Sequence, residues 1–321
     1  MNTKIRILMG ALALATATGA QADDYPSRPI SLMVSYSPGG ATDFQARIVT
    51  MMAADAKLLG QPIVIINKAG AGGKVGWNAF ADKASTDGYE LAAYNVPHFI
   101  AQSITGKTKY NIDNLEPIAN WGADPAVLIV PKASPFKSAK DLVEFAKKNP
   151  GKLTVNGAGL YVGHHIAMLQ LQKASATKLA YIPEKGGAPA MKSVIAGQVM
   201  AGFNNLSDAF RARDQVRILA IADLERNKDF LPDVPTFREQ GIDIDDSSVN
   251  FRGVMVRKGT PQAVIDRLAE RVPAMFSHPR SLKQMKAGGS PVRVIKRDQV
   301  RVMCQERQKA LTALLSDLKK K

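Results

Sequence analysis

The stretch ISLMVSYSPGGATD, residues 30–43, predicts a strand, a tight turn and the start of a helix. The run from Ile30 to Tyr36 is rich in apolar residues, as is typical of a buried strand in a parallel sheet. The proline that follows ends the strand, and the two glycines after it allow backbone angles and close approaches that a Cβ would forbid. Thr42 or Asp43 is then expected to cap a helix over residues 42–58.

The same turn is suited to holding an anion. The first residues of a helix present unpaired N–H groups at the positive end of the helix dipole, so a carboxylate or phosphate bound there satisfies both. A purely structural turn is the alternative for the Pro-Gly-Gly segment taken alone. The rest of the chain favours the binding role.

The N-terminal residues have the pattern of a secretory signal peptide. Lys4 and Arg6 precede an uncharged stretch over residues 7–20, and Ala20-Gln21-Ala22 fits the small-x-small cleavage rule. We therefore predict a signal peptide over residues 1–22, cleavage after Ala22 and a periplasmic location. A membrane span is the alternative, but the stretch contains glycine and several threonines and is short for a bilayer crossing.

The composition predicts a compact soluble protein that favours anions. Hydrophobic residues make up 45% of the chain and charged residues 22%, which leaves enough apolar side chain for a large core. Without Lys4 and Arg6, 41 of the 43 basic residues remain against 28 acidic ones. A basic balance also suits nucleic acid or an anionic membrane surface, but the cations are scattered along the chain. We predict a solvated basic surface and no nucleic-acid partner.

No pattern in the sequence predicts catalysis, a metal or a cofactor. Cys304 is the single cysteine, so it cannot form an intramolecular disulfide, and we expect a buried structural thiol. His164 and His165 are adjacent at an expected helix start, where they point apart, and no acid or cysteine stands at a chelating offset. Residues 70–76 resemble a dinucleotide fingerprint, but the third glycine falls one place late. The Gly-x-Ser-x-Gly elbow of hydrolases does not occur.

Strand-like and helix-like segments alternate along the chain. Such alternation predicts an α/β fold of two doubly wound sheets, with ligands at the carboxyl ends of the strands. The length of 321 residues favours two lobes over a single core. Besides the opening stretch, we expect strands at residues 62–67, 89–95, 126–130, 152–156 and 217–222, and helices at 139–148, 164–173, 188–196, 263–276 and 298–318.

An ordered set of short segments carries a family resemblance. Each segment alone is weak, but together they span the chain from Tyr25 almost to its end, and they resemble the substrate-binding receptors of tripartite tricarboxylate transporters. The segments are YPSRPI at 25–30, SPGGATD at 37–43, LGQP at 59–62, NKAGAGG at 67–73, DGYEL at 87–91, AKKNPGKLT at 146–154, AGQV at 196–199, LPDVPT at 231–236 and KGTP at 258–261.

The resemblance implies a periplasmic binding protein of the two-lobed, type II or Venus-flytrap kind, with a hinge between its lobes. Residues 23–124 and 225–321 would form lobe 1, and residues 125–224 lobe 2. Such a receptor is not an enzyme and needs no cofactor. A monomer of this kind captures a small organic carboxylate and delivers it to a two-subunit inner-membrane permease. A ligand-sensing protein that presents its closed form to a sensor kinase is the alternative, and an exported hydrolase is disfavoured by the missing nucleophile motifs.

The resemblance also implies that backbone amides of two loops, one from each lobe, hold a ligand carboxylate. The residues that it implicates are Tyr36, Ser37, Gly39, Gly40, Ala41, Thr42 and Asp43 in the first loop, Asn156, Gly157, Ala158, Gly159, Tyr161 and His165 in the second, and Glu184, Asn204 and Asn205 beyond them.

Some residues depart from the family pattern and bear on the ligand. Tyr161-Val162 stands where a Gly-Ser pair is usual, Glu184 where a tyrosine is common, and Asn204 where an aspartate is common. If Glu184 faces the cleft, it repels a plain dicarboxylate. Our hypothesis is a ligand with a carboxylate at one end and a cationic, hydroxyl or amide group at the other. In the alternative interpretation, Glu184 faces solvent or pairs with Lys185.

Overall fold

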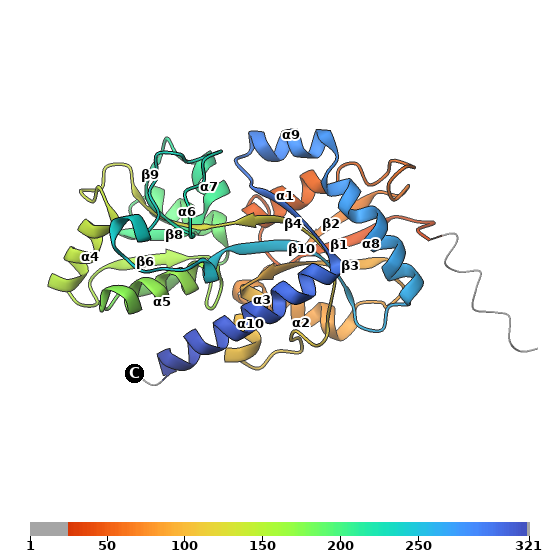
Figure 1. The fold of residues 1–321 in the computed structure, drawn as a ribbon, viewed down its shortest axis with the longest axis horizontal. Coiled ribbons are helices and arrows are strands. Elements are labelled where there is room, and N and C mark those ends of the chain that lie inside the picture. The colour runs from red at the N-terminus through yellow and green to blue at the C-terminus, as the bar shows by residue number, and fades with distance from the viewer. Residues whose placement is uncertain (1–24, 320–321) are drawn as a thin grey trace, which may run out of the picture.

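The computed structural model describes residues 25–319, which form a six-stranded sheet and a five-stranded sheet side by side with helices on both (Figure 1). The predicted signal peptide lies outside the described residues. The six-stranded sheet has the order β11-β4-β10-β3-β1-β2, and we call it, with its helices, lobe 1. Its strands are β1 (Ile30–Val34), β2 (Ile63–Asn67), β3 (Glu90–Val96), β4 (Leu115–Asp124), β10 (Asn250–Arg257) and β11 (Val292–Lys296).

The five-stranded sheet, in the order β7-β6-β8-β5-β9, belongs to lobe 2. Both sheets combine parallel and antiparallel pairs, as in β1 with β3 and β10 with β3. The strands of lobe 2 are β5 (Ala126–Pro131), β6 (Thr154–Gly157), β7 (Ala180–Pro183), β8 (Ala201–Asn205) and β9 (Val216–Ala222). The fold is therefore the two-sheet α/β architecture that the sequence predicts.

The helices pack on both lobes, and several begin where strands end. They are α1 (Ala41–Val49), α2 (Lys74–Lys83), α3 (His98–Thr105), α4 (Ala139–Lys148), α5 (Gly163–Ser175), α6 (Gly187–Ile195), α7 (Leu206–Arg211), α8 (Gln262–Phe276), α9 (Pro279–Ala287) and α10 (Arg297–Lys319), with short 3₁₀ turns η1 (Ala71–Gly73), η2 (Arg238–Gln240) and η3 (Asp246–Ser248). In the described part of the chain, no helix has the length and apolarity that a bilayer crossing requires.

The first helix differs from the sequence prediction at both ends. Its N-cap is Gly40 rather than Thr42 or Asp43, and the Asp43 carboxylate reaches back to accept the Gly39 N–H at 2.9 Å. The helix ends at Val49 instead of residue 58. Residues 50–60 continue as successive turns closed by bonds from residue i+3 to residue i, such as the N–H of Ala53 to the carbonyl of Thr50.

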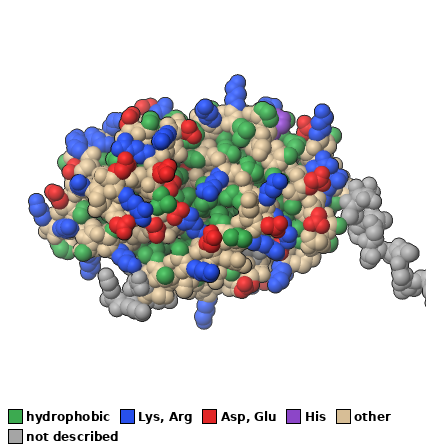
Figure 2. Space-filling model, viewed as in Figure 1, with side chains coloured by type: hydrophobic (Ala, Val, Ile, Leu, Met, Phe, Trp, Pro, Cys, Tyr) green, Lys and Arg blue, Asp and Glu red, His purple; other side chains and the backbone are tan. Residues whose placement is uncertain are grey.

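The hydrophobic core of lobe 1 contains side chains from its sheet and from the helices packed on it, including α10. Cys304 on α10 is buried in this core, as predicted, and burial raises the pKa of its thiol to about 12. Figure 2 shows Lys and Arg side chains scattered among Asp and Glu over one face, without a single continuous basic patch on that face. The charge on this face is therefore a solvated surface.

The two lobes are connected where β4 passes into β5 and where the chain returns into β10. The crossing is short, because only Pro125 separates β4 from β5. The return runs between Ala222 and Asn250 and includes η2 and η3. Strands β4 and β10 pair antiparallel, and Asp124 at the end of β4 lies opposite Asn250 at the start of β10. The chain therefore leaves lobe 1 and returns to it at neighbouring positions. The boundaries expected at residues 124/125 and 224/225 stay predictions.

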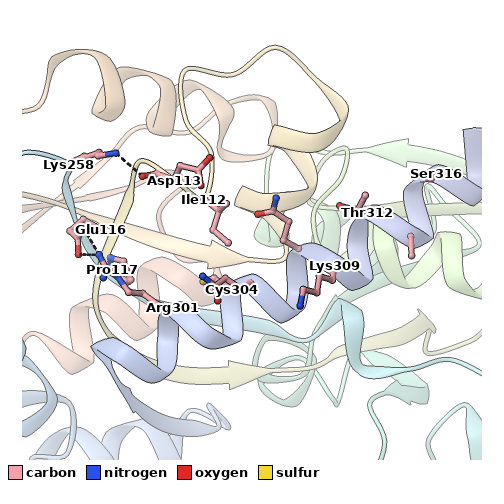
Figure 3. Close-up of a pocket in the computed structure, with 13 residues that line it drawn as sticks. Ile112, Asp113, Glu116, Pro117, Lys258, Arg301, Cys304, Lys309, Thr312 and Ser316 are labelled. Carbon is pink, nitrogen blue, oxygen red and sulfur yellow. Dashed lines mark hydrogen bonds and ion pairs between the residues drawn. The ribbon is translucent and has the colours of Figure 1, made fainter.

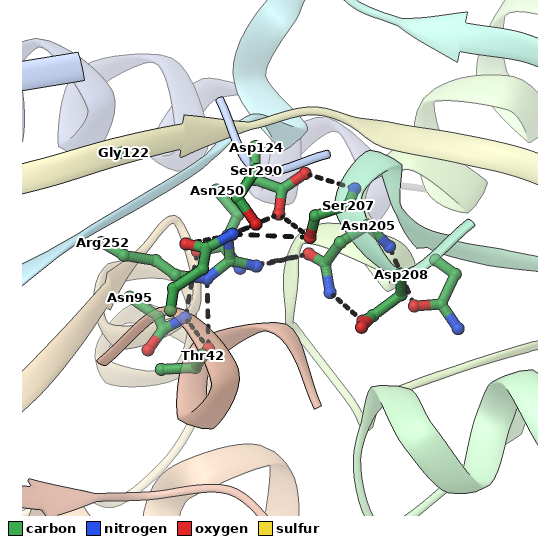
Figure 4. Close-up of polar contacts among 12 residues, drawn as sticks. Thr42, Asn95, Gly122, Asp124, Asn205, Ser207, Asp208, Asn250, Arg252 and Ser290 are labelled. Atoms are coloured by element: carbon green, nitrogen blue, oxygen red, sulfur yellow. Dashed lines mark hydrogen bonds and ion pairs between the residues drawn. The ribbon is translucent and has the colours of Figure 1, made fainter. Parts of the chain in front are cut away.

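A buried ion pair occupies this crossing. Arg252 on β10 and Asp124 at the end of β4 are both fully buried, with the guanidinium NH1 2.7 Å from the carboxylate (Figure 4). The same guanidinium donates to Asn205 Oδ1 at 2.7 Å, to Thr42 Oγ1 at 3.1 Å and to Gln45 Oε1 at 3.2 Å. One side chain thus joins α1 of lobe 1, the crossing, and the end of β8 in lobe 2.

We predict that Asp124→Asn strongly destabilises the protein. Removing one partner of a buried pair leaves the other charge uncompensated, which costs about 3–5 kcal/mol. Urea unfolding followed by circular dichroism measures the loss. The matched control is Asp87→Asn in the exposed Arg28–Asp87 pair, where screening by water makes the same change much less costly. Equal losses in the two variants would contradict a structural role for the buried pair.

Candidate functional site

A small cavity of about 20 Å³ lies between the lobes, at the carboxyl ends of β1, β3, β6 and β8. Its volume is enough for about one water molecule. An organic ligand therefore requires the lobes to move apart from this closed arrangement. The lining residues come from both lobes and are Tyr36, Ser37, Gly40, Ala41, Thr42, His98, Ala158, His164, Gly187, Ala188, Asn205 and Asn250.

A larger groove of about 920 Å³ lies elsewhere, between α10 and the segment that enters β4 (Figure 3). It is open to solvent and lined largely by polar side chains of α10, and Glu116, one of its two acidic lining residues, is already paired with Arg297 and Arg301. It lies away from the strand ends where α/β folds bind ligands. The interlobe cavity is therefore the candidate site.

Helix N-termini lie at the wall of the cavity. Within residues 25–319, α1, α3, α5 and α6 all begin at its wall, each through residues of its first turn. Their unpaired N–H groups and positive dipole ends favour a negative charge. None of the described lining residues is Asp, Glu, Lys or Arg, although the charge of the buried Arg252 also acts on His98 and His164. The arrangement suits a small anion bound through backbone groups.

His164 supplies a side-chain donor to the cavity. The backbone N–H of Ala158 donates to its Nδ1 at 3.1 Å, which places the ring hydrogen on Nε2. Nε2 is buried and makes no hydrogen bond of ordinary geometry. Burial lowers the pKa of this histidine to about 4, although the nearby Asn205 side chain partly offsets the lowering, so the ring is neutral at pH 7. The neutral Nε2–H can therefore donate a hydrogen bond to an acceptor in the cavity.

His98, the first residue of α3, faces the same cavity from lobe 1. Its Nδ1 lies 2.5 Å from the Tyr36 hydroxyl, and its Nε2 is buried without a hydrogen-bond partner. Burial lowers the pKa of His98 well below the ordinary value, with a further contribution from His164. Two neutral imidazoles, one from each lobe, thus line the cavity, and each has a buried nitrogen without a hydrogen-bond partner.

The structure brings seven of the predicted site residues to the cavity. These are Tyr36, Ser37, Gly40, Ala41, Thr42, Ala158 and Asn205. The others surround it without lining it: Gly39, Asp43, Asn156, Gly157, Gly159, Tyr161, His165, Glu184 and Asn204.

Several of these surrounding residues hold the loops in place. Asp43 pairs with Arg47, and Asn204 donates to the Gly187 carbonyl at the start of α6 at 3.0 Å. Asn156 donates to the carbonyl of Ala190 at 3.0 Å.

The side chains of Glu184 and His165 do not line the cavity and bind to other residues of lobe 2. The Glu184 carboxylate accepts a hydrogen bond from Ser193 at 2.7 Å. His165 accepts the Tyr161 N–H at 3.0 Å and stacks on Tyr181 with ring centroids 4.3 Å apart. Both residues therefore shape lobe 2 behind the cavity wall.

Sequence reasoning missed His98, His164, Gly187, Ala188 and Asn250 as lining residues. His98 carried a usable signal, because it follows directly on a predicted strand, where parallel sheets place their sites. The choice between His164 and its neighbour depends on the exact start of α5, which the sequence pattern leaves uncertain by a residue or more. No local sequence pattern marks Gly187, Ala188 or Asn250, because the packing of α6 and β10 in the complete fold brings them to the cavity.

The lobes contact each other directly around the cavity. Gln102 of lobe 1 donates to the Leu160 carbonyl of lobe 2 at 3.1 Å, and Ser37 donates to the Lys185 carbonyl at 3.3 Å. A Cβ on Gly159 would lie 2.8 Å from the Gly72 Cα, so this backbone approach requires glycine. The described residues thus represent a closed cleft.

Two facing α/β lobes with an anion-favouring cavity between them define a bilobal solute-binding protein. Comparison with known proteins identifies the family. Residues 46–319 match the TctC tripartite tricarboxylate transporter family receptor, and the chain belongs to this family. Because members of this family are transporter receptors, the protein is a binding protein and not an enzyme.

Individual relatives agree with this assignment. A UPF0065 protein from the tcbD-tcbE intergenic region of Pseudomonas sp. strain P51 is 33% identical over 302 residues, covering 89% of this chain and 88% of its own. A periplasmic transporter structure matches with a TM-score of 0.83 at 29% identity, over 91% of this chain and 97% of its own. MatC from Rhodopseudomonas palustris with bound malate matches with a TM-score of 0.81 at 26% identity, over 90% and 99%.

The buried histidines predict acid sensitivity. Burial lowers the pKa of both His164 and His165 from 6.5 to about 4, so the unfolded chain binds more protons between these values. The free energy of unfolding should therefore fall as the pH drops from about 6.5 to about 4, by up to roughly 3 kcal/mol for each histidine.

Urea unfolding at pH 7.0 and pH 4.5 measures this effect. His164→Asn should remove its own share of the acid-dependent loss, because asparagine does not titrate. Carboxylates contribute equally to both proteins and cancel in the comparison. The same pH dependence in the variant and the unmodified protein would show that His164 is not the titrating group.

Proposed function

We propose that this protein is a periplasmic receptor that captures a small organic carboxylate and delivers it to a two-subunit permease of the tripartite tricarboxylate type. The observation that carries the proposal is the convergence of four helix N-termini and the His164 Nε2–H on one interlobe cavity with no charged side chain among its described lining residues. The bound malate of MatC supports a carboxylate ligand. Export by the predicted signal peptide, with cleavage after Ala22, and a monomeric receptor are part of the proposal.

The ligand would bind to separated lobes and favour their closure. The first loop, with Gly40 and Ala41, and the second, with Ala158 and His164, would contact one carboxylate from opposite sides. A ligand shifts a conformational equilibrium only through contacts that one state makes better than the other. A carboxylate bridging two lobes has this property, because an open cleft offers it one wall at a time.

The expected ligand class can be tested by thermal shift. The protein without residues 1–22 is screened against mono-, di- and tricarboxylates, amino acids and aromatic acids. A ligand at one hundred times its dissociation constant stabilises a protein by about 2.7 kcal/mol, which is a readable shift. We expect hits among carboxylates, confirmed by calorimetry. Stabilisation by no carboxylate would contradict the proposal.

The role of His164 can be tested against a matched neighbour. His164→Asn removes the Nε2–H that faces the cavity, whereas His165→Asn changes an adjacent buried histidine that lies behind the wall. Hydrogen bonds to charged groups contribute about 1.5–3 kcal/mol, so His164→Asn should weaken carboxylate binding roughly tenfold to hundredfold. We expect a smaller change from His165→Asn. Titration calorimetry measures both, and equal effects would refute the assigned contact.

A further inference from the structure

The hydrogen-bonding role of His98 follows from its neighbours. The Tyr36 hydroxyl lies 3.0 Å from the Gly72 carbonyl oxygen and 2.5 Å from His98 Nδ1. A carbonyl only accepts, and a hydroxyl has one hydrogen. Both contacts are hydrogen bonds only if Tyr36 donates to Gly72 and accepts from an Nδ1–H of His98. The remaining nitrogen, Nε2, then carries a lone pair and is an acceptor.

This acceptor is unsatisfied and lies at the interlobe cavity. Nε2 of His98 is buried and has no partner, and a Cβ built on Gly163 of lobe 2 would lie 3.3 Å from it. His98 therefore reaches across to the start of α5. Leaving a buried acceptor unpaired is unfavourable, and a ligand donor at this place would offset that cost. His164 presents the opposite character, because its free Nε2 carries a hydrogen.

The two imidazoles could each form a hydrogen bond with a different group of the same ligand. His164 donates and suits a carboxylate oxygen, while His98 accepts and suits an N–H or O–H. Both side chains line the same interlobe cavity in the closed arrangement, so the ligand groups that they contact on closure should be neighbours. The geometry fits a donor on the carbon next to the carboxylate.

The surroundings of the cavity select a hydroxyl as this donor. An ammonium group would meet the positive ends of four helices, and the acids nearest the wall are already paired, Asp208 with Arg211 and Asp124 with Arg252. The two acids of the predicted site are also engaged elsewhere, since Asp43 pairs with Arg47 and Glu184 accepts a hydrogen bond from Ser193. An amide brings two hydrogens to a single unpartnered acceptor. A hydroxyl donates one hydrogen and can accept from the helix N–H groups.

We propose that His98 is a specificity-determining residue that accepts a hydrogen bond from the 2-hydroxyl of the ligand, so that this receptor prefers 2-hydroxy acids to the unsubstituted and the 2-amino acids. The inference rests on the proposed carboxylate receptor and names its ligand class. A site that hydrogen-bonds a ligand hydroxyl rejects the analogue that lacks it, since the buried acceptor is then left unpaired.

The test uses ligand pairs that differ by one group. Titration calorimetry compares malate with succinate and aspartate, and lactate with propionate and alanine. We expect the hydroxy acid to bind about tenfold or more tightly than its deoxy partner. If carboxylates bind but the hydroxy and deoxy acids bind equally, or the amino acids bind best, the inference is wrong and the receptor function stands. If no carboxylate binds, both are wrong.

Three variants assign the preference to His98. In His98→Asn the amide can still donate to Tyr36 but does not reach the position of Nε2, so the hydroxy-to-deoxy ratio should fall to about one. His98→Gln can place an amide oxygen near that position and should retain a preference. His278→Asn, at the N-cap of α9, is the control and should leave the ratio unchanged.

The ratio is independent of how much folded protein each variant yields, because it compares two ligands on the same sample. A general weakening that leaves the ratio intact in His98→Asn would overturn the role of His98. A ratio lost in the asparagine variant and kept in the glutamine variant would establish it.

Discussion

The cleft depends on the buried pair between Arg252 and Asp124. The guanidinium is held by the carboxylate and by oxygens of Thr42, Gln45 and Asn205, and the carboxylate also accepts the N–H and hydroxyl of Ser207. The start of α1, the crossing strand and the start of α7 are thereby fixed to one another. Leaving any of these groups unpaired in the interior is costly, so the network favours the closed arrangement of the cavity walls.

This network also explains why the cavity attracts anions without presenting a cation. The bonds of Arg252 point to Asp124 and its amide and hydroxyl partners, and Arg252 is not among the lining residues. The helix ends, which are fixed parts of the fold, contribute to the field in the cavity together with the buried charge of Arg252. Preorganised backbone dipoles need no rearrangement when a charge arrives. The basic surface charge can raise the local concentration of anions, but it does not select among them.

The sequence allowed local features to be predicted and left the distant ones hidden. Residues 30–43 predicted the strand, the turn and a following helix because proline, glycine and apolar patterning act locally, although the helix is capped at Gly40 rather than at Thr42 or Asp43. The crossing strands β4 and β10 escaped prediction, since their role depends on pairing between segments more than a hundred residues apart. Arg252 has no local motif at all. His98 was visible as a residue after a strand, but only its buried, unpartnered Nε2 gives it a role.

The closed arrangement sets a condition on any ligand. In this state the lobes already contact each other through Gln102 and Leu160 and through Ser37 and Lys185, and the space between them is about 20 Å³. A ligand that enters must replace such direct contacts with its own, because an organic acid is larger than this space. A ligand that hydrogen-bonds to both imidazoles and to the N–H groups of the helix ends would compensate for the lost contacts between the lobes. Selectivity then arises from closure itself, through groups that an open cleft leaves exposed to water.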